Sequence, residues 1–133
     1  MQYSPKISII TVCFNSEETI KDTIESVVSQ KFSDYEHIIC DGGSTDNTIN
    51  ILDRCSHSKL KYVSEPDDGL YDAMNKSIAL AQGEYIGFLN SDDVYSSNEV
   101  LSIIGEHLNE NVDAIYGDIN YTKRENLEIV TRK

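Results

Sequence analysis

The stretch ISIITVCFNSEETIKDTIESVVSQKFSDYEHIICDGGSTD, residues 7–46, carries the pattern that decides the fold. It begins with a β-branched apolar run at residues 7–14 and returns to a second apolar run at residues 35–40. Between these runs, apolar side chains recur at the spacing of a helix: Ile20, Ile24, Val27 and Val28. Nearly continuous apolar runs are typical of strands that are covered on both faces. The stretch therefore predicts a strand, a helix and a second strand parallel to the first.

The same alternation continues through the rest of the chain. Further strands are expected at residues 60–64, 85–89 and 114–116, and further helices from residue 45 or 46, at 70–82 and at 97–108. We expect Ser16 to cap the first helix and Gly83 to end the third in the left-handed conformation. Beyond Lys123 the pattern is weak, and Ile129-Val130 is either a strand or a frayed end. This alternation of strands and helices predicts an α/β fold with a mostly parallel central sheet flanked by helices. In such a fold, ligands bind at the carboxyl ends of the strands.

Bulk composition narrows the class of protein. The chain has 133 residues, enough for one domain, and a formal net charge of −12, which disfavours nucleic-acid binding. A divalent cation would still let acidic side chains bind a nucleotide. The three cysteines, Cys13, Cys40 and Cys55, are expected to be free thiols, the first two buried. No leader peptide or membrane span is recognised, so we expect a cytoplasmic protein.

Two acidic side chains follow the strand expected at residues 85–89, in the sequence Asn90-Ser91-Asp92-Asp93. Hard cations such as Mg²⁺ and Mn²⁺ prefer carboxylate oxygens, and Mg²⁺ commonly uses one or two of them together with substrate phosphates. Ser91 or Asp92 could instead cap the following turn or helix. The sequence alone leaves both interpretations open.

A second candidate loop, Asp41 followed by Gly-Gly-Ser-Thr-Asp, comes after the strand expected at residues 35–40. Its glycines permit close approach of a ligand, and its first carboxylate could accept hydrogen bonds from a base or ribose. The alternative is a glycine-rich turn in which Asp46 caps the next helix. A third segment, residues 65–76, places an acidic turn before a helix. We expect its Tyr71 and Met74 in the core and Lys76 exposed.

Several kinds of site find no support in the sequence. Neither the dinucleotide fingerprint G-x-G-x-x-G nor the phosphate loop G-x-x-x-x-G-K-[ST] occurs. His37, His57 and His107 are scattered without metal-ligand spacing, and no nucleophilic serine or cysteine motif is present.

Four segments in order resemble family 2 glycosyltransferases of the GT-A fold, a Rossmann-like nucleotide-diphospho-sugar transferase fold. They are KISIITVCFNSEETI, the helix end SVVSQKF, YEHIICDGGSTDNT and VSEPDDGLYDAMNKSIALAQGEYIGFLNSDD. The last is similar to bacterial enzymes that build O-antigen, capsule or colanic-acid polysaccharide. The resemblance covers residues 6–121.

The resemblance implies a role for each matching position. The residues that are expected to bind the nucleotide are Val12, Phe14, Asn15, Glu17, Asp41, Asp68, Gly69, Asn90 and Ser91. Asn90-Ser91-Asp92 matches the D-x-D motif, and the implied ligands of Mn²⁺ or Mg²⁺ are Asp92, its final residue, and Asp93 beside it.

Two departures from the family's pattern stand out. Asn90 replaces the first acid of the motif, which removes one negative charge. The family's catalytic base lies in an acceptor-binding half, beyond Lys133 here, so we expect residues 1–133 to be the nucleotide-sugar-binding part of a truncated protein, inactive on its own.

The resemblance implies inverting transfer of a sugar from a nucleotide-diphosphate sugar, with a UDP-sugar as the expected donor, to a saccharide or lipid-linked acceptor in bacterial surface polysaccharide synthesis. One alternative is a nucleotide- and metal-binding module without activity. A sugar nucleotidyltransferase would need a glycine-rich basic loop where residues 13–18 are acidic and glycine-free. A phosphate-accepting signalling domain would need acidic pairs after the first strand and an Asp after the third, whereas Val12-Cys13-Phe14 is apolar. Peripheral membrane association at the inner face and homo-oligomerisation are left open.

Overall fold

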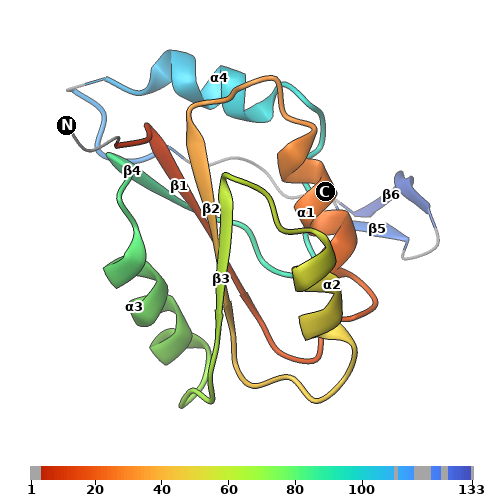
Figure 1. Ribbon diagram of the computed structural model, residues 1–133. Helices are drawn as coiled ribbons and strands as arrows, with labels where there is room; N and C mark the ends of the chain where they lie inside the picture. The colour runs from red at the N-terminus through yellow and green to blue at the C-terminus, as the bar shows by residue number, and fades with distance from the viewer. Residues whose placement is uncertain (1–3, 110, 116–120, 124–125, 133) are drawn as a thin grey trace.

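The computed structural model describes residues 4–109, 111–115, 121–123 and 126–132 (Figure 1). Strands and helices alternate along the chain as far as α4, and a short hairpin follows. The strands are β1 Ile7–Cys13, β2 Tyr35–Asp41, β3 Leu60–Ser64, β4 Tyr85–Phe88, β5 Tyr121–Lys123 and β6 Asn126–Arg132. The helices are α1 Ile20–Val28, α2 Thr48–Arg54, α3 Leu70–Leu80 and α4 Val100–His107.

Four strands form one parallel sheet in the order β3-β2-β1-β4. β1 pairs with β2 along its whole length, from Ile7 opposite Tyr35 to Cys13 opposite Asp41. β4 pairs with the first part of β1 and forms one edge of this sheet, while β5 and β6 form a separate antiparallel pair. Because the four strands are parallel, their carboxyl ends meet at the same edge, where open sheets bind ligands.

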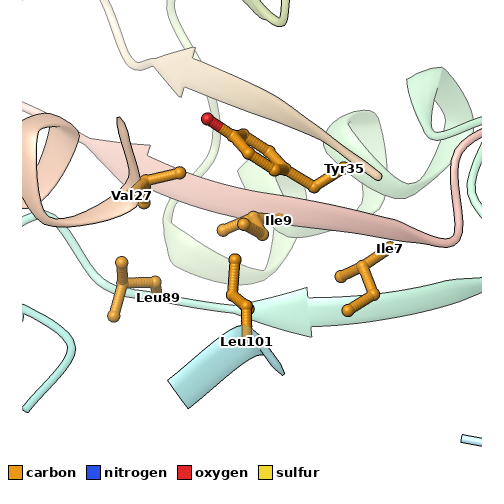
Figure 2. Packing of buried hydrophobic residues seen from close by; sticks show 6 residues of the cluster. All are labelled: Ile7, Ile9, Val27, Tyr35, Leu89 and Leu101. Atoms are coloured by element: carbon orange, nitrogen blue, oxygen red, sulfur yellow. The ribbon is translucent and has the colours of Figure 1, made fainter. Parts of the chain in front are cut away.

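Helices cover both faces of the sheet (Figure 1). α3 lies on one face, over a cluster that contains Ile10, Val12 and Ile38. α1, α2 and α4 lie on the other, where Val27 of α1 and Leu101 of α4 pack against β1 (Figure 2). Every residue of β1 and β2 is buried, as expected of central strands covered on both sides.

β4 differs from the two central strands because its residues are not uniformly buried. Ile86 and Phe88 are 41% and 51% exposed. By strand register, they lie on the same face of the sheet as Ser8 and Ile10, the face that carries α3. α3 packs over β1 and β2, so it leaves these two apolar side chains of β4 uncovered.

Three helices begin later than predicted. α1 begins at Ile20 rather than directly after Ser16, α2 at Thr48 rather than residue 45 or 46, and α4 at Val100 rather than residue 97. The Ser16 hydroxyl does not cap α1; it bonds the carbonyl of Phe14 at 3.3 Å, while the Ser16 amide donates to the Thr48 hydroxyl at 2.9 Å. Residues 16–19 have a sequence that is typical of the start of a helix. Hydrogen bonds to distant residues hold them in a loop instead.

One side chain that the sequence places in the core lies outside it: Tyr71 is 81% exposed. Val28, the last residue of the helical pattern at residues 20–28, is 52% exposed. In α3 the fully inward positions are the small residues Ala73 and Ser77, and Met74 packs only partly against the core. The prediction counted Tyr71 as core because it is aromatic, but the helix turns it away from the sheet.

The C-terminal part corrects one prediction and resolves another. Residues 114 and 115 do not form a strand, and Tyr116, the third residue of that predicted strand, lies outside the described residues. Ile129 and Val130 belong to β6 and so form a strand rather than a frayed end. All three cysteines are free thiols, with Cys13 and Cys40 buried as predicted. Within the described residues, no helix has the length and apolar character needed to cross a bilayer.

Gly83 has a different role from the one predicted. The C-cap of α3 is Ala81, which is extended, and Gly83 is not among the glycines with a positive φ. Instead, Gly83 passes directly against β1, and its amide donates to the Ser8 hydroxyl at 2.8 Å. A Cβ atom at Gly83 would lie 2.6 Å from the backbone nitrogen of Ser8.

Gly83→Ala is therefore expected to lower the free energy of unfolding by about 3 kcal/mol, because a backbone atom of the central strand cannot move aside. Urea denaturation measures this. Gly87→Ala is the matched control: its Cβ would meet only Ile7, at 4.0 Å. Gly87 lies inside a strand, where alanine is expected to be neutral or stabilising by about 0.5 kcal/mol. Equal midpoints for the two variants would contradict the packing role of Gly83.

Candidate nucleotide and metal site at the carboxyl edge of the sheet

Asn15 connects the loop after β1 to the loop after β2. It has a positive φ of 47°, a left-handed conformation that Asn tolerates better than most residues. Its amide donates to the Ser44 hydroxyl at 2.7 Å, and its side-chain oxygen accepts from the amides of Thr45 at 2.8 Å and Asp46 at 3.3 Å. Asn15, a predicted nucleotide-binding residue, thus also holds the first loop (residues 14–19) against the second loop (residues 42–47).

Glu17 strengthens the same junction. Its carboxylate accepts from the amide of Asn47 at 3.2 Å, and its own amide donates to the Asp46 carboxylate at 3.3 Å. Of the other predicted residues near the end of β1, Val12 is buried beneath α3, whereas Phe14 is 53% exposed. The exposed ring of Phe14 is the side chain here that is free to contact a ligand.

Asp41 is almost completely buried at the end of β2, with 2% of its surface exposed. One carboxylate oxygen accepts from the amides of Gly43 at 3.1 Å and Ser44 at 2.8 Å, and from the Ser64 hydroxyl at 2.8 Å. The other accepts from the Ser44 hydroxyl and from the Cys13 thiol, the latter at 3.4 Å.

This environment keeps Asp41 charged. Burial acts to raise the pKa of its carboxyl, but the hydrogen bonds from Ser44, Ser64 and Cys13 outweigh it and hold the pKa below the usual range. The pKa of the Cys13 thiol is raised, first by burial and then by the charge of Asp41. Asp41 is therefore a buried anion that holds the second loop in shape. The groups that donate hydrogen bonds to its carboxylate would compete with any ligand that Asp41 binds.

The third loop (residues 65–69) lies against the second. A Cβ atom at Gly42 would be 2.7 Å from a carboxylate oxygen of Asp67, so a larger residue there would require the Asp67 side chain to shift. Gly69 has a φ of 111° and donates its amide to Asp67 at 3.0 Å, while the amide of Asp68 donates to Asp72 at 2.9 Å. The predicted residues Asp68 and Gly69 are exposed at the start of α3.

A pocket of about 260 Å³ opens beside this contact, between β2, β3 and α3. It is lined by Cys40, Asp41, Val63, Glu65, Asp67, Ala73, Lys76, Ala79 and Leu80. Lys76 is less exposed than predicted, because it pairs with Glu65 at 3.2 Å and Asp72 at 3.3 Å. The sequence did not predict that Glu65 and Lys76 line a pocket. The acidic turn before the helix was the one signal that pointed to this segment.

Residues 90–93 form a tight turn directly after β4, which we call the carboxylate turn. The amide of Leu89 donates to the carbonyl of Ile10 at 2.9 Å, and the amide of Asp93 donates to the carbonyl of Asn90 at 3.0 Å. The side chains of Asn90, Asp92 and Asp93 are exposed. The pKa of Asp93 is raised, first by burial and then by the charge of Asp92, although a hydrogen bond from Asn90 opposes the shift.

The carboxylate turn has the chemistry of a weak cation site. Among the described residues, neither Asp92 nor Asp93 forms an ion pair with a lysine, arginine or histidine, so their mutual repulsion is uncompensated. In the same part of the chain, no three histidine, cysteine or acidic side chains gather to enclose a metal ion. The turn therefore fits an ion that takes one or two carboxylates and completes its shell from phosphates and water.

The loops of the predicted site meet at one edge of the sheet. The first loop bonds the second through Asn15 and Glu17, and it bonds the carboxylate turn through the Ser16 and Ser91 hydroxyls, 3.1 Å apart. The third loop touches the second at Gly42. The segments that carry Asp41 and Asp92 are thus connected through the first loop rather than separated on different faces.

Comparisons with known proteins agree with this arrangement. Residues 8–133 match the family described as Glycosyl transferase family 2. The chain is 40% identical over 103 residues to the uncharacterized glycosyltransferase Rv1514c of Mycobacterium tuberculosis, covering 77% of this chain and 39% of that protein. It is 35% identical over 125 residues to the UDP-Glc:alpha-D-GlcNAc-diphosphoundecaprenol beta-1,3-glucosyltransferase WfgD of Escherichia coli, covering 93% of this chain and 49% of WfgD. The chain thus spans less than half the length of these two relatives.

Solved structures share the fold. Residues 1–349 of TarS from S. aureus, in complex with UDP-GlcNAc, match with a TM-score of 0.71 and 28% identity, over 76% of this chain and 30% of that one. Glucosyl-3-phosphoglycerate synthase from Mycobacterium tuberculosis, in complex with Mn²⁺, UDP and glucosyl-3-phosphoglycerate, matches with a TM-score of 0.64 and 25% identity, over 78% of this chain and 40% of that one. The predicted fold class, a largely parallel α/β sheet of the GT-A type, is confirmed. The match over residues 8–133 shows that the chain belongs to glycosyl transferase family 2.

Proposed function

We propose that residues 1–133 are the nucleotide-sugar-binding part of an inverting, metal-dependent glycosyltransferase. Its donor is a nucleotide-diphosphate sugar, with a UDP-sugar as the choice that we propose, and its acceptor is a saccharide or a lipid-linked acceptor in bacterial surface polysaccharide synthesis. The observation that carries the proposal is the hydrogen-bonded junction of the first loop with both the second loop and the carboxylate turn. The names of WfgD and of the TarS complex, both of which refer to a UDP-sugar, support this choice of donor.

In the proposed arrangement, the nucleoside lies over the first and second loops. The exposed Phe14 ring offers an apolar face to the base, and Asp41 keeps the second loop in shape through its buried hydrogen bonds. Asp68 and Gly69 border the nucleotide from the third loop, at the start of α3. Asn90 is neutral, whereas related motifs carry an acid at this position. Its side chain would donate a single hydrogen bond to a ribose hydroxyl or accept one from it.

Asp92 and Asp93 would hold the divalent cation, Mn²⁺ or Mg²⁺. When bound, it supplies the positive charge that stabilises the leaving nucleoside diphosphate. The chain's own contribution is to hold both carboxylates in a tight turn beside the nucleotide loops, so that the diphosphate lies next to them. The base that deprotonates the acceptor is expected outside residues 1–133, so the chain alone should bind its donor without transferring the sugar.

Calorimetric titration of UDP, GDP and dTDP, each with and without Mn²⁺, tests the proposal. We expect one nucleotide to bind, with an affinity that rises about tenfold or more in Mn²⁺, since two ligands that contact each other are typically coupled by about 5- to 150-fold. UDP is the expected choice. Binding of none of the three, or binding that Mn²⁺ leaves unchanged, would remove the proposed site. Sugar transfer by this chain alone would show that the acceptor half is not needed.

A further inference from the structure

Thr23 is a fully buried polar residue on the face of α1 that packs against the sheet. Its hydroxyl lies 2.7 Å from the carbonyl of Asp93 and 3.0 Å from the carbonyl of Ser91. These two carbonyls stand on either side of Asp92 in the chain. A hydroxyl has one proton, so Thr23 donates to one carbonyl at a time while it remains within reach of both.

This contact determines how the carboxylate turn sits on the core. The turn closes on itself through the Asp93 amide and the Asn90 carbonyl, and the Ser16 hydroxyl contacts it at Ser91. Asp92 is exposed, and in the described part of the chain no cationic side chain pairs with it. The direction of its carboxylate is therefore set by the backbone of the turn, and Thr23 is the buried group that fixes this backbone.

The same edge of α1 holds the chain beyond the turn. The Ser26 hydroxyl accepts from the amide of Tyr95 at 3.3 Å. The Gln30 side chain donates to the carbonyl of Ser97 at 2.6 Å and accepts from the amide of Leu101 at 3.0 Å. Thr23 and Ser26 of α1, together with Gln30 two residues beyond its end, form a polar edge that binds residues 91–101 at successive points.

α1 also follows directly from the first loop. That loop carries Phe14 and Asn15, the proposed nucleotide contacts, and its Ser16 carbonyl accepts from the amide of Ile20, the first residue of α1. One short helix thus joins the nucleotide side of the proposed site to its metal side. A shift of the carboxylate turn relative to α1 would change the distance between the two.

We propose that Thr23 is a positioning residue that sets the geometry of Asp92 for the cation by holding the backbone carbonyls of Ser91 and Asp93. This inference rests on the proposed function, in which Asp92 is a metal ligand. Groups that orient a metal ligand from outside its coordination shell commonly change metal affinity by about 10- to 100-fold when they are removed. Thr23 acts from outside that shell, through the backbone of the turn.

The test compares Thr23→Val with Thr23→Ser. Valine keeps the volume and loses the hydroxyl, whereas serine keeps the hydroxyl. The first measurement is the Mn²⁺ midpoint, which is the Mn²⁺ concentration that gives half of the full enhancement of nucleotide binding. The second is the affinity for the nucleotide without metal. The nucleotide is UDP, or GDP or dTDP if the titration selects one of them. We expect Thr23→Val to raise the Mn²⁺ midpoint by about tenfold, to leave the metal-free affinity within about twofold, and to be rescued in Thr23→Ser.

Thr11→Val is the matched control. Thr11 is also fully buried, and its hydroxyl bonds a ring nitrogen of His37 at 2.8 Å, away from the carboxylate turn. The same substitution there should reduce stability while the Mn²⁺ midpoint stays at the wild-type value. A midpoint that rises equally in both variants, or in neither, would overturn the role of Thr23.

Two further outcomes are distinct from these. If the wild-type chain shows no Mn²⁺ effect, the proposed function itself fails, and this inference fails with it. If Thr23→Val does not fold, Ser26→Ala decides, because it removes the next hydroxyl of the same polar edge. We then expect a midpoint raised by about threefold, less than the effect at Thr23 because Tyr95 lies further from Asp92. An unchanged midpoint in Ser26→Ala would then overturn the inference.

Discussion

Asp92→Asn is expected to abolish the Mn²⁺ enhancement of nucleotide binding while the metal-free affinity stays the same. Asparagine has nearly the same shape but no charge, and a cation that takes only one or two carboxylates loses much of its attraction when one becomes neutral. The loss in apparent affinity at saturating Mn²⁺ should equal the coupling between metal and nucleotide, about 10- to 100-fold. Calorimetry at matched Mn²⁺ concentrations measures it.

Neighbouring variants determine which carboxylate matters. Asp93→Asn should have a smaller effect, because Asp92 matches the final acid of the D-x-D motif whereas Asp93 only lies beside it. Asp113→Asn is the control for charge alone, since Asp113 is an exposed acid outside the carboxylate turn. If Asp92→Asn retains the full Mn²⁺ effect, or if Asp113→Asn loses as much, the assignment of Asp92 as a ligand is wrong.

The second large effect expected is a loss of stability in acid that depends on His37. His37 is fully buried on β2, its Nε2 atom lies 2.8 Å from the Thr11 hydroxyl, and its Nδ1 atom has no hydrogen-bond partner among the described residues. Burial, followed by the charge of His57, lowers the pKa of His37 to about 3. An imidazole in the unfolded chain takes up its proton near its ordinary pKa of about 6.5.

Between these two pKa values the unfolded chain binds a proton that the folded chain does not. The free energy of unfolding therefore falls as the pH falls from about 6.5 towards 3, by up to about 1.4 kcal/mol for each pH unit. Over the full window this approaches about 5 kcal/mol, which is comparable with the whole stability of a small domain.

Urea denaturation at several pH values isolates the contribution of His37. In His37→Gln the titrating group is gone, so the slope of stability against pH in this window should be shallower than in the wild type. His107→Gln is the control, because His107 is exposed on α4 and its substitution should leave the slope unchanged. Parallel slopes for the wild type and His37→Gln would show that folding leaves the pKa of His37 unchanged, contrary to its burial.

Much of the fold could be predicted because its main determinants are local. The alternation of apolar runs and helical spacing predicts β1, β2, β3 and β4 with errors of at most one residue at each end. Predictions failed where a distant partner overrides a local preference. The sequence Ser16-Glu17-Glu18 resembles the start of a helix, yet the Ser16 amide is bonded to Thr48 of α2 and Glu17 is bonded to the second loop, and α1 begins at Ile20.

The same reason explains what was missed in the candidate site. The role of Thr23 could not be predicted from the sequence, because it is a single polar residue on the apolar face of a helix. Its partners Ser91 and Asp93 lie 68 and 70 residues further along the chain. Gly83 follows a helix and was therefore interpreted as a cap, but its close approach to Ser8 in β1 becomes visible only when the sheet is assembled. By contrast, Asp41 and the carboxylate turn could be found, because they follow apolar strands directly and parallel strands bring such positions to one edge.

The uncovered side of β4 has a consequence for handling this chain in solution. Among the residues that the structure describes, β4 pairs with β1 alone, and its Ile86 and Phe88 remain exposed. A strand with free backbone donors and acceptors and apolar side chains is a template for adding another strand. Self-association through β4 should therefore increase with protein concentration, and Ile86→Lys, in the interior of the strand rather than beside the carboxylate turn, should improve solubility.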